Sequence, residues 1–366
     1  LNRNFFWGGS DKKTKVHLCQ WDLLCRPKSK GGLGFKKTHE MNKALLAKSG
    51  WRLLKKDEGL WAQIFEKKYL RGHSPCDPNL HLKQNCSPTW KGIVFGSQLL
   101  EKGLIWRLGK GDNINFWKDK WIADEALIHM VEVSPDSSMD TIVSDFLMDG
   151  WWDIEKLRRV LPEDWVQKII GCPADLGGTT EDCQIWQTTS NGLFSVKTAY
   201  ELSVRFNEVP GSPWNFIWNL KIPPRVKMFT WLLTQKKILT NVQRVRRHLS
   251  RDPSCPLCHY HEESLQRLFI SCPRVLALWR SFYLPEGLIN FFSSDFDSWL
   301  KENLCYNAGH IRNLKWSSIF AVACWFIWKW RYHSIFEPHF QMPCRPNQII
   351  VEYHLEWDKA NNLLKK

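Results

Sequence analysis

The chain has 366 residues, of which 43% are hydrophobic, and a formal net charge of +14. This length and apolar content predict two or three domains with hydrophobic cores, and they exclude a disordered chain. The chain begins with Leu1 rather than Met, so we expect it to be a fragment of a longer product.

Twelve cysteines occur in the chain, and no signal-peptide pattern precedes them. A chain of this size needs no disulfides to fold, so we expect a reducing, intracellular location, with the nucleus as a candidate compartment. The longest apolar run, residues 319–328, is about half as long as the ~20 residues that span a bilayer. It predicts a buried helix, no transmembrane segment and no membrane partner.

Basic residues are concentrated in two stretches. Residues 1–56 hold fourteen Lys or Arg against three acids, and residues 221–251 hold nine and no acid. Such stretches suit a polyanion, so RNA or DNA is the leading candidate partner. Lysine-rich helices that face solvent without a partner are the alternative, and charge by itself leaves both open.

Several local patterns predict elements in the first 210 residues. Apolar residues at helical spacing predict a helix over residues 42–54. Alternating polarity predicts one hairpin over residues 104–122 and a second over residues 185–196, which turns at Asn191-Gly192. We expect the tryptophans of the first hairpin to fill a small core rather than to stack on bases. Pro210, Gly211 and Pro213 mark a linker.

Two helices are predicted after this linker. Pro223-Pro224 opens the first in the way that proline favours, and Thr240 with Gln243 forms a capping box for the second. On the second helix Arg244, Arg247 and Arg251 recur at helical spacing, which predicts one basic ridge. Guanidinium groups bind phosphates in a bidentate manner, so the ridge is a candidate contact for nucleic acid.

A cluster of soft ligands follows the basic ridge. Cys255 and Cys258 form a CxxC turn, which supplies half of a tetrahedral zinc site, and Cys272 is the natural third ligand. His259 and His261 are both available as the fourth ligand. The alternative is a pair of buried thiols beside solvent-exposed histidines, without metal.

Strings along nearly the whole chain resemble one family, the plant non-LTR (LINE-type) retrotransposon reverse transcriptases, in the region after the polymerase core. The strings are Phe6-Trp7-Gly8, Trp21-Asp22, residues 27–34, 42–48 and 51–54, Trp61-Ala62, residues 106–111, 117–121, 192–200 and 218–229, and the cysteine cluster from Cys255 to Pro273. The last two resemble the reverse-transcriptase zinc-binding domain of this family, some members of which are described as ribonuclease H proteins.

The resemblance implies a zinc pattern of CxxC, then His in a His-Leu-Phe string, then Cys. Here that string reads Arg267-Leu268-Phe269, so the expected histidine is absent. Either His261 substitutes for it, or the site is degraded. Because His259 directly follows a ligand cysteine, we predict zinc ligands at Cys255, Cys258, His261 and Cys272.

Neither catalytic set of the family's enzymes occurs in this sequence. The chain has no Tyr-x-Asp-Asp string, and the 26 residues after Phe340 are too few for an RNase H domain. We therefore expect a non-catalytic, zinc-binding and nucleic-acid-binding fragment or remnant. The alternatives are part of an active reverse transcriptase or RNase H whose catalytic domains lie outside this chain, and a domesticated protein-interaction module.

The expected fold is α+β and mostly helical, with small β-hairpins in the N-terminal and middle parts and a helical zinc-binding domain on the C-terminal side. The predicted segments are a basic region with a Trp-rich hairpin (1–125), an acidic segment with the Asn-Gly hairpin (126–210), the zinc-binding-like domain (213–340) and a tail (341–366). The predicted nucleic-acid contacts are Arg225, Lys227, Arg244, Arg247 and Arg251.

Overall fold

The computed structural model describes residues 6–8, 16–77, 86–132, 138–148, 150–172, 180–204, 214–337 and 339–363. The chain forms two compact units, one from Leu1–Phe35 with Phe206–Lys366 and one from Lys36–Arg205. The described residues are mostly helical, and their strands form small two-stranded antiparallel sheets. This confirms the predicted fold class. The four predicted segments stay a prediction, and the predicted linker lies outside the described residues.

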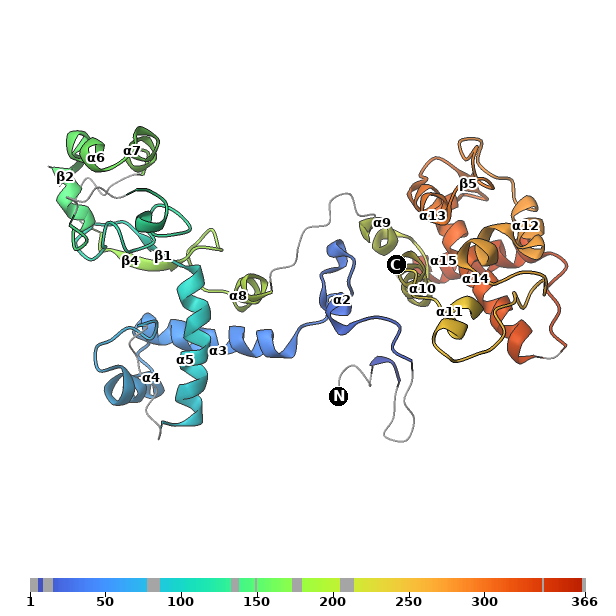
Figure 1. The fold of residues 1–366 in the computed structure, drawn as a ribbon, viewed down its shortest axis with the longest axis horizontal. Helices are drawn as coiled ribbons and strands as arrows, with labels where there is room; N and C mark the ends of the chain where they lie inside the picture. Colours follow the sequence, from blue (N-terminus) through green and yellow to red (C-terminus); the bar gives the residue numbers. More distant parts are fainter. Residues whose placement is uncertain are drawn as a thin grey trace. The chain divides into compact units, whose positions relative to one another are not determined.

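The unit Lys36–Arg205 consists of helices and two small two-stranded sheets, β1 with β4 and β2 with β3 (Figure 1). Its elements are α3 (Thr38–Leu54), α4 (Leu60–Phe65), η2 (Glu66–Leu70), α5 (Pro88–Gly103), β1 (Leu104–Arg107), η3 (Leu127–His129), η4 (Val143–Phe146), β2 (Leu147–Met148), β3 (Trp151–Trp152), α6 (Ile154–Val160), α7 (Glu163–Ile170), β4 (Cys183–Trp186) and α8 (Val196–Ser203).

Helix α3 confirms the helix predicted over residues 42–54 and crosses α5, as Figure 1 shows. The crossing is close because small residues line it. A Cβ added to Gly96 of α5 would lie 2.4 Å from the backbone nitrogen of Ala47, and one added to Gly50 of α3 would lie 2.6 Å from Ser97 Oγ. Any larger residue at Gly96 would push the two helices apart.

The two predicted hairpins pair differently from the prediction. Strand β1 forms its ladder with β4, in the register Leu104 opposite Trp186. Its contact with residues 114–122 is the hydrogen bond that the N–H of Trp106 donates to the carbonyl of Lys120 at 2.7 Å. The predicted Asn191-Gly192 turn does form, and Gly192 has the positive φ of 71° that such a turn needs. After the turn the chain enters α8 without a second strand. Local alternation in polarity identified strand β1 but could not identify its distant partner.

The segment between β1 and β2 folds around aromatic side chains. Trp117 and Trp121 are buried with Phe116 and Phe146, which confirms that these tryptophans fill a core. Asp182 closes the loop that precedes them, because its carboxylate accepts hydrogen bonds from the backbone N–H groups of Gly109, Gly111 and Asn113 at 2.8–2.9 Å. The Asp182 side chain therefore occupies the loop of residues 109–113.

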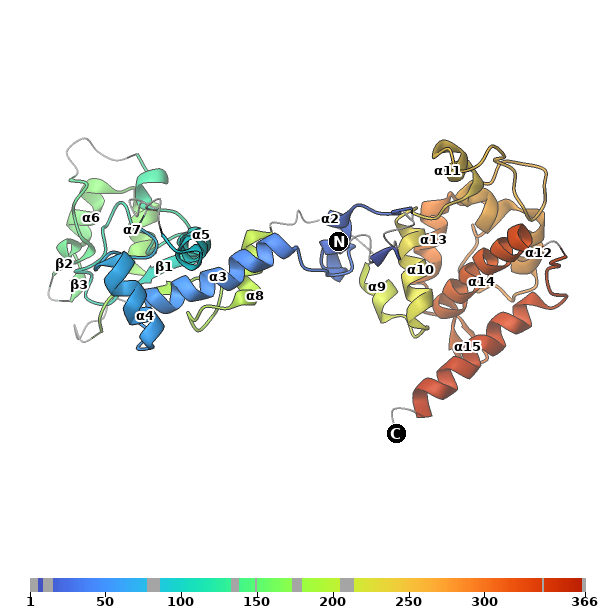
Figure 2. The same cartoon turned by 90° about the horizontal axis from the view of Figure 1, so that it is seen from below.

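The second unit, Leu1–Phe35 with Phe206–Lys366, is helical and is built on one long buried helix (Figure 2). Its elements are α2 (Trp21–Cys25), η1 (Lys28–Lys30), α9 (Trp214–Asn219), α10 (Pro224–Thr234), α11 (Asn241–Arg246), η5 (Arg267–Ser271), α12 (Pro273–Arg280), α13 (Phe296–Cys305), β5 (His310–Ile311), β6 (Leu314–Lys315), α14 (Trp316–Phe336) and α15 (Pro346–Leu363).

Helix α14 is the centre of this unit and contains the predicted apolar run. It is buried along most of its length, and α10, α13 and α15 pack against it. The N-terminal segment joins the same unit through Gly31, whose carbonyl accepts hydrogen bonds from Trp231 Nε1 and Gln235 Nε2, both at 2.9 Å. Although α14 has 21 residues, no helix in the described part of the chain combines the length and apolar character needed to cross a membrane.

Candidate functional site

A short turn, residues 254–262, presents two cysteines to the core. Ser254 bridges Glu262, and the backbone N–H of Cys255 donates to the carbonyl of His261 at 2.7 Å. The N–H of His259 donates to the carbonyl of Cys255, and His259 takes a positive φ of 60° to close the loop. We call residues 254–262 the thiol turn.

Cys255, Cys258 and Cys272 are all buried, and their sulfur atoms lie within 4.8 Å of one another. We call these three residues the thiol cluster. Cys272 comes from a different part of the chain, since it is the N-cap residue of α12 and follows η5 directly. Its sulfur lies 4.0 Å from that of Cys255.

The surroundings of the thiol cluster favour a thiolate at Cys272. The hydrogen bond that the Cys255 thiol donates lowers the pKa of Cys272, and the N–H groups of Arg274 and Val275 in the first turn of α12 lower it further. The same shared proton, together with burial, raises the pKa of Cys255. The proton between the two sulfurs is the one that a soft metal ion would displace.

The thiol cluster fits zinc. Tetrahedral zinc with Zn–S bonds of ~2.3 Å holds its sulfur ligands about 3.8 Å apart, close to the Cys255–Cys272 separation of 4.0 Å. Two of the cysteines are held by a tight turn and the third by a helix N-terminus, so little rearrangement is needed. These residues can therefore supply three of four zinc ligands.

Arg267 lies where the fourth ligand is expected. Its Nη2 donates to Cys258 Sγ at 3.6 Å, and its Nη1 donates to the carbonyl of Ser271 at 3.0 Å. Its Nε is buried without a hydrogen-bond partner. The guanidinium at this position thus contacts the thiol cluster directly, and a guanidinium cannot bind a metal ion because it does not deprotonate in proteins.

His261, the predicted fourth ligand, is exposed, as is His259. Among the described residues, neither belongs to the group whose ligand atoms lie within 4.8 Å of one another. The structure therefore brings three of the four predicted ligands together. Ligation by His261 stays a prediction, and it would require the thiol turn to change conformation.

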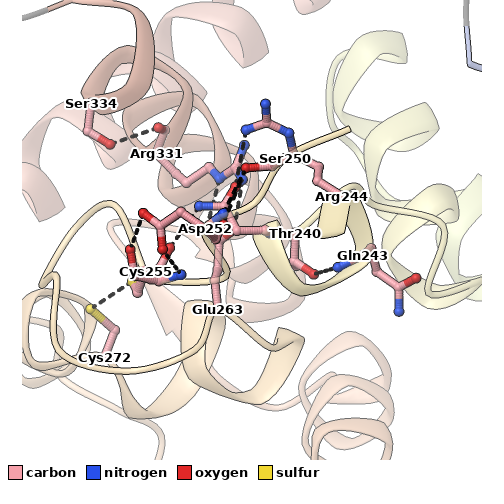
Figure 3. A network of polar contacts seen from close by, with 12 residues as sticks. Thr240, Gln243, Arg244, Ser250, Asp252, Cys255, Glu263, Cys272, Arg331 and Ser334 are labelled. Atoms are coloured by element: carbon pink, nitrogen blue, oxygen red, sulfur yellow. Dashed lines mark hydrogen bonds and ion pairs between the residues drawn. The ribbon is translucent and has the colours of Figure 1, made fainter. Parts of the chain in front are cut away.

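A buried ion pair is connected to the thiol turn by hydrogen bonds (Figure 3). Glu263, which is fully buried, accepts two hydrogen bonds from Arg331 of α14, at 2.8 Å and 2.7 Å. Arg331 also donates to Asn241 Oδ1 at 2.8 Å, and Asn241 Nδ2 donates to the carbonyl of Ser254 at 2.7 Å. The network fixes α11, the thiol turn and α14 to one another.

No pattern in the sequence predicted this network. Glu263 and Arg331 are 68 residues apart, and each looks like an ordinary surface charge in a linear sequence. Only their burial shows that they depend on each other.

The predicted phosphate contacts fall into two groups. Three of them are engaged inside the protein: Arg225 donates to Tyr353 Oη at 2.7 Å, Lys227 donates to the carbonyl of Trp218 at 2.7 Å, and Arg244 donates to Asn241 Oδ1 at 3.2 Å. Burial also lowers the pKa of Lys227. Arg247 and Arg251 are exposed.

The prediction that three arginines form one basic ridge on a helix face is wrong. The Thr240 cap forms as predicted, since its side chain accepts from the N–H of Gln243. However, α11 ends at Arg246, and His248 has a positive φ of 57° that breaks the helical path. Arg247 and Arg251 therefore follow the helix in an exposed segment. Arg246, which was not predicted, is exposed beside them.

Comparison with known proteins agrees with the site. The family described as "zinc-binding in reverse transcriptase" matches residues 194–279, which include the whole thiol cluster. Together with the geometry of the three thiols, this match confirms zinc as the cofactor. No solved structure matches the chain.

Two curated proteins of Arabidopsis thaliana are similar to the chain. One, named "Putative ribonuclease H protein", is 34% identical over 98% of this chain, and the chain spans 58% of its length. The other, named "Uncharacterized mitochondrial protein", is 32% identical over 33% of this chain and 78% of its own length.

Proposed function

Because this chain belongs to the plant non-LTR retrotransposon reverse-transcriptase-like proteins, we propose that it is a non-catalytic, zinc-containing module that binds RNA or DNA. Its work would be to hold nucleic acid for a catalytic unit elsewhere. We also propose an intracellular location, with the nucleus as the candidate compartment.

One observation carries this proposal. Residues 221–251 contain nine Lys or Arg and no acid, and the last three of them, Arg246, Arg247 and Arg251, are exposed. We call these three residues the arginine segment. The acid that follows directly, Asp252, accepts hydrogen bonds from the backbone N–H and the hydroxyl of Ser254. A local excess of exposed guanidinium groups attracts phosphates and releases their counterions.

Zinc would act on this surface indirectly. The arginine segment ends four residues before Cys255, and the thiol turn is tied to α11 through the hydrogen bond from Asn241 to Ser254. Zinc bound to the thiol cluster would hold both ends of the segment and so limit the entropy lost when it binds. Zinc supplies structural cross-linking here, and the arginines supply the contacts.

The test is the salt dependence of binding. Fluorescence anisotropy should measure the affinity of the zinc-loaded chain for labelled single-stranded RNA, single-stranded DNA and duplex DNA between 50 and 200 mM salt, a range over which phosphate-dominated binding weakens strongly. Replacing the three residues of the arginine segment with Gln should lower affinity on every sequence and reduce the salt slope by about 3 on duplex DNA.

The matched control removes three positive charges elsewhere in the same unit. Arg280, Lys301 and Lys329 are exposed, so their replacement with Gln changes net charge equally. If both triple variants lose the same affinity, net charge alone explains the effect, and the arginine segment is not a defined binding surface. Absent or salt-independent binding would reject the function and favour a protein-interaction module.

A second function is supported by the span of the match. The chain covers 58% of a relative named as a ribonuclease H protein, so catalytic domains of such a protein could be encoded beside it. Under this alternative the chain is the nucleic-acid-holding part of an active enzyme. Sequencing the transcript in both directions tests it: an in-frame upstream polymerase motif or downstream carboxylate set supports it, and early stop codons reject it.

A further inference from the structure

A pocket of about 280 Å³ lies beside the N-terminus of α14 and shares no residue with the thiol cluster or the arginine segment. Segments from α9, β6, α14 and α15 line it. Its volume is just below the range of about 300–1,000 Å³ typical of small-molecule sites, so it suits a small group. The polar residues that line it and carry the argument are Lys221, Lys315, Ser317, Ser318, His354 and Asp358.

The first turn of α14 supplies backbone donors to this pocket. The N-cap residue, Lys315, makes no side-chain cap, and the first turn contains no acidic residue. Trp316 N–H donates to the carbonyl of Gly309 at 2.8 Å. The N–H groups of Ser317 and Ser318 belong to the same first turn, which has no intrahelical acceptors. The positive end of a 21-residue helix therefore opens onto the pocket.

An unpartnered histidine provides independent evidence for a ligand. The side chain of His354 on α15 is 2% exposed and lines the pocket, and its Nδ1 is buried without a hydrogen-bond partner. A buried polar atom without a partner is costly, and proteins rarely leave one unless a ligand or water satisfies it. Burial lowers the pKa of His354, against the opposing effect of the nearby Asp358 carboxylate.

The charges around the pocket favour an anion. Lys221 and Lys315 are exposed at its rim, together with His310. The opposing charge is Asp358, whose carboxylate accepts a hydrogen bond from Asn362 Nδ2 at 3.1 Å. With both lysines charged and one carboxylate, the lining is net positive before the helix dipole is counted.

We propose that this pocket binds a phosphoryl group, held by the N-terminal N–H groups of α14, by Lys315 and Lys221, and by Nδ1 of His354. The phosphoryl group would come from a free phosphate compound or from the 5′ end of a nucleic-acid strand. The proposal does not depend on the arginine segment, because inorganic phosphate is enough to test it.

Equilibrium dialysis of radiolabelled inorganic phosphate against the zinc-loaded chain, at constant ionic strength, measures the site directly. We expect one phosphate per chain. Lys315→Glu should weaken binding by roughly tenfold or more, since it places a negative charge at the helix N-terminus. His354→Gln should weaken it as well. Lys329→Glu, an exposed lysine on the same helix outside the pocket, is the matched control and should leave binding unchanged.

A second arm distinguishes the source of the phosphoryl group. The ligand is the end of a strand if a 5′-phosphorylated oligonucleotide binds more tightly than its 5′-hydroxyl counterpart and Lys315→Glu removes the difference. The ligand is a free phosphate compound if the two oligonucleotides bind equally and inorganic phosphate still binds. The Gln variant of the arginine segment should retain phosphate, which separates this site from the proposed function. No stoichiometric phosphate binding, or equal loss in Lys315→Glu and Lys329→Glu, would overturn the proposal.

Discussion

Replacing Arg267 with His tests where the fourth zinc ligand belongs. Arg267 Nη2 lies 3.6 Å from Cys258 Sγ, so a shorter side chain at this position still faces the thiol cluster. An imidazole there would complete a Cys3His set, and it would also remove a cation that competes with zinc for the thiolates. We therefore expect Arg267→His to bind zinc more tightly than the natural chain.

The size of the gain follows from the share that one ligand contributes. Structural zinc sites with four ligands bind with about 10–16 kcal/mol at pH 7, so one ligand contributes about 3 kcal/mol, or roughly a hundredfold in affinity. Arg267→Ala removes the cation without adding a ligand, and its affinity should lie between those of the natural chain and Arg267→His.

Competition with a chromophoric chelator measures the affinities, and cobalt substitution reports the ligands. Cobalt bound by four ligands in a tetrahedron absorbs strongly in the visible region, so Arg267→His should intensify these bands. His261→Ala should leave the natural chain unchanged, because His261 is exposed outside the thiol cluster. If Arg267→His gains nothing while His261→Ala loses about a hundredfold, the reasoning is refuted and His261 is the ligand.

Three predictions concern stability. Glu263→Gln should lower the free energy of unfolding in urea by about 3–5 kcal/mol, because it leaves Arg331 buried without its partner. As a control, Asp297→Asn breaks the exposed ion pair with Lys236 and should cost less than about 1 kcal/mol. Similar costs for the two variants would contradict the role given to burial. Asp182→Ala should cost about 2–4 kcal/mol by freeing three backbone donors, and a thermal unfolding midpoint equal to that of the natural chain would contradict it. Hydrogen bonds from Ser298 and Asp297 lower the pKa of Asp295, the N-cap of α13, so its stabilising effect is present above about pH 4 and is lost as pH falls. When unfolding midpoints are measured over a pH series, Asp295→Asn should reduce the loss of stability at acid pH. If this loss is the same as in the natural chain, other carboxyl groups cause it.

Local signals in the sequence predicted the elements whose causes are local. Pro224 begins α10 and Thr240 caps α11, because a fixed φ and a side-chain acceptor act within one turn. The end of α11 was missed because the left-handed residue there is His248 rather than a glycine. The three cysteines of the thiol cluster were predicted from spacing, which reflects the short reach of a CxxC turn.

Features that join distant residues were not predictable in the same way. Strand β1 alternates in polarity as any edge strand would, and nothing in residues 104–107 specifies β4 as its partner. The contact of Arg267 with Cys258 depends on how η5 packs, and spacing cannot show this. The proposed phosphate pocket combines residues from 216 to 358, which lie near one another only in the folded unit.

The ion pair between Glu263 and Arg331 bears on the order in which the chain can mature during synthesis. All three cysteines of the thiol cluster leave the ribosome before Arg331 does, and the family match itself ends at residue 279. A nascent chain, or one cut after α12, would hold its complete set of thiols, but burying Glu263 next to them without Arg331 would cost several kcal/mol. We therefore expect zinc capture to become durable only after α14 has docked, so that prematurely terminated chains are cleared by proteolysis although no zinc-ligating cysteine is missing.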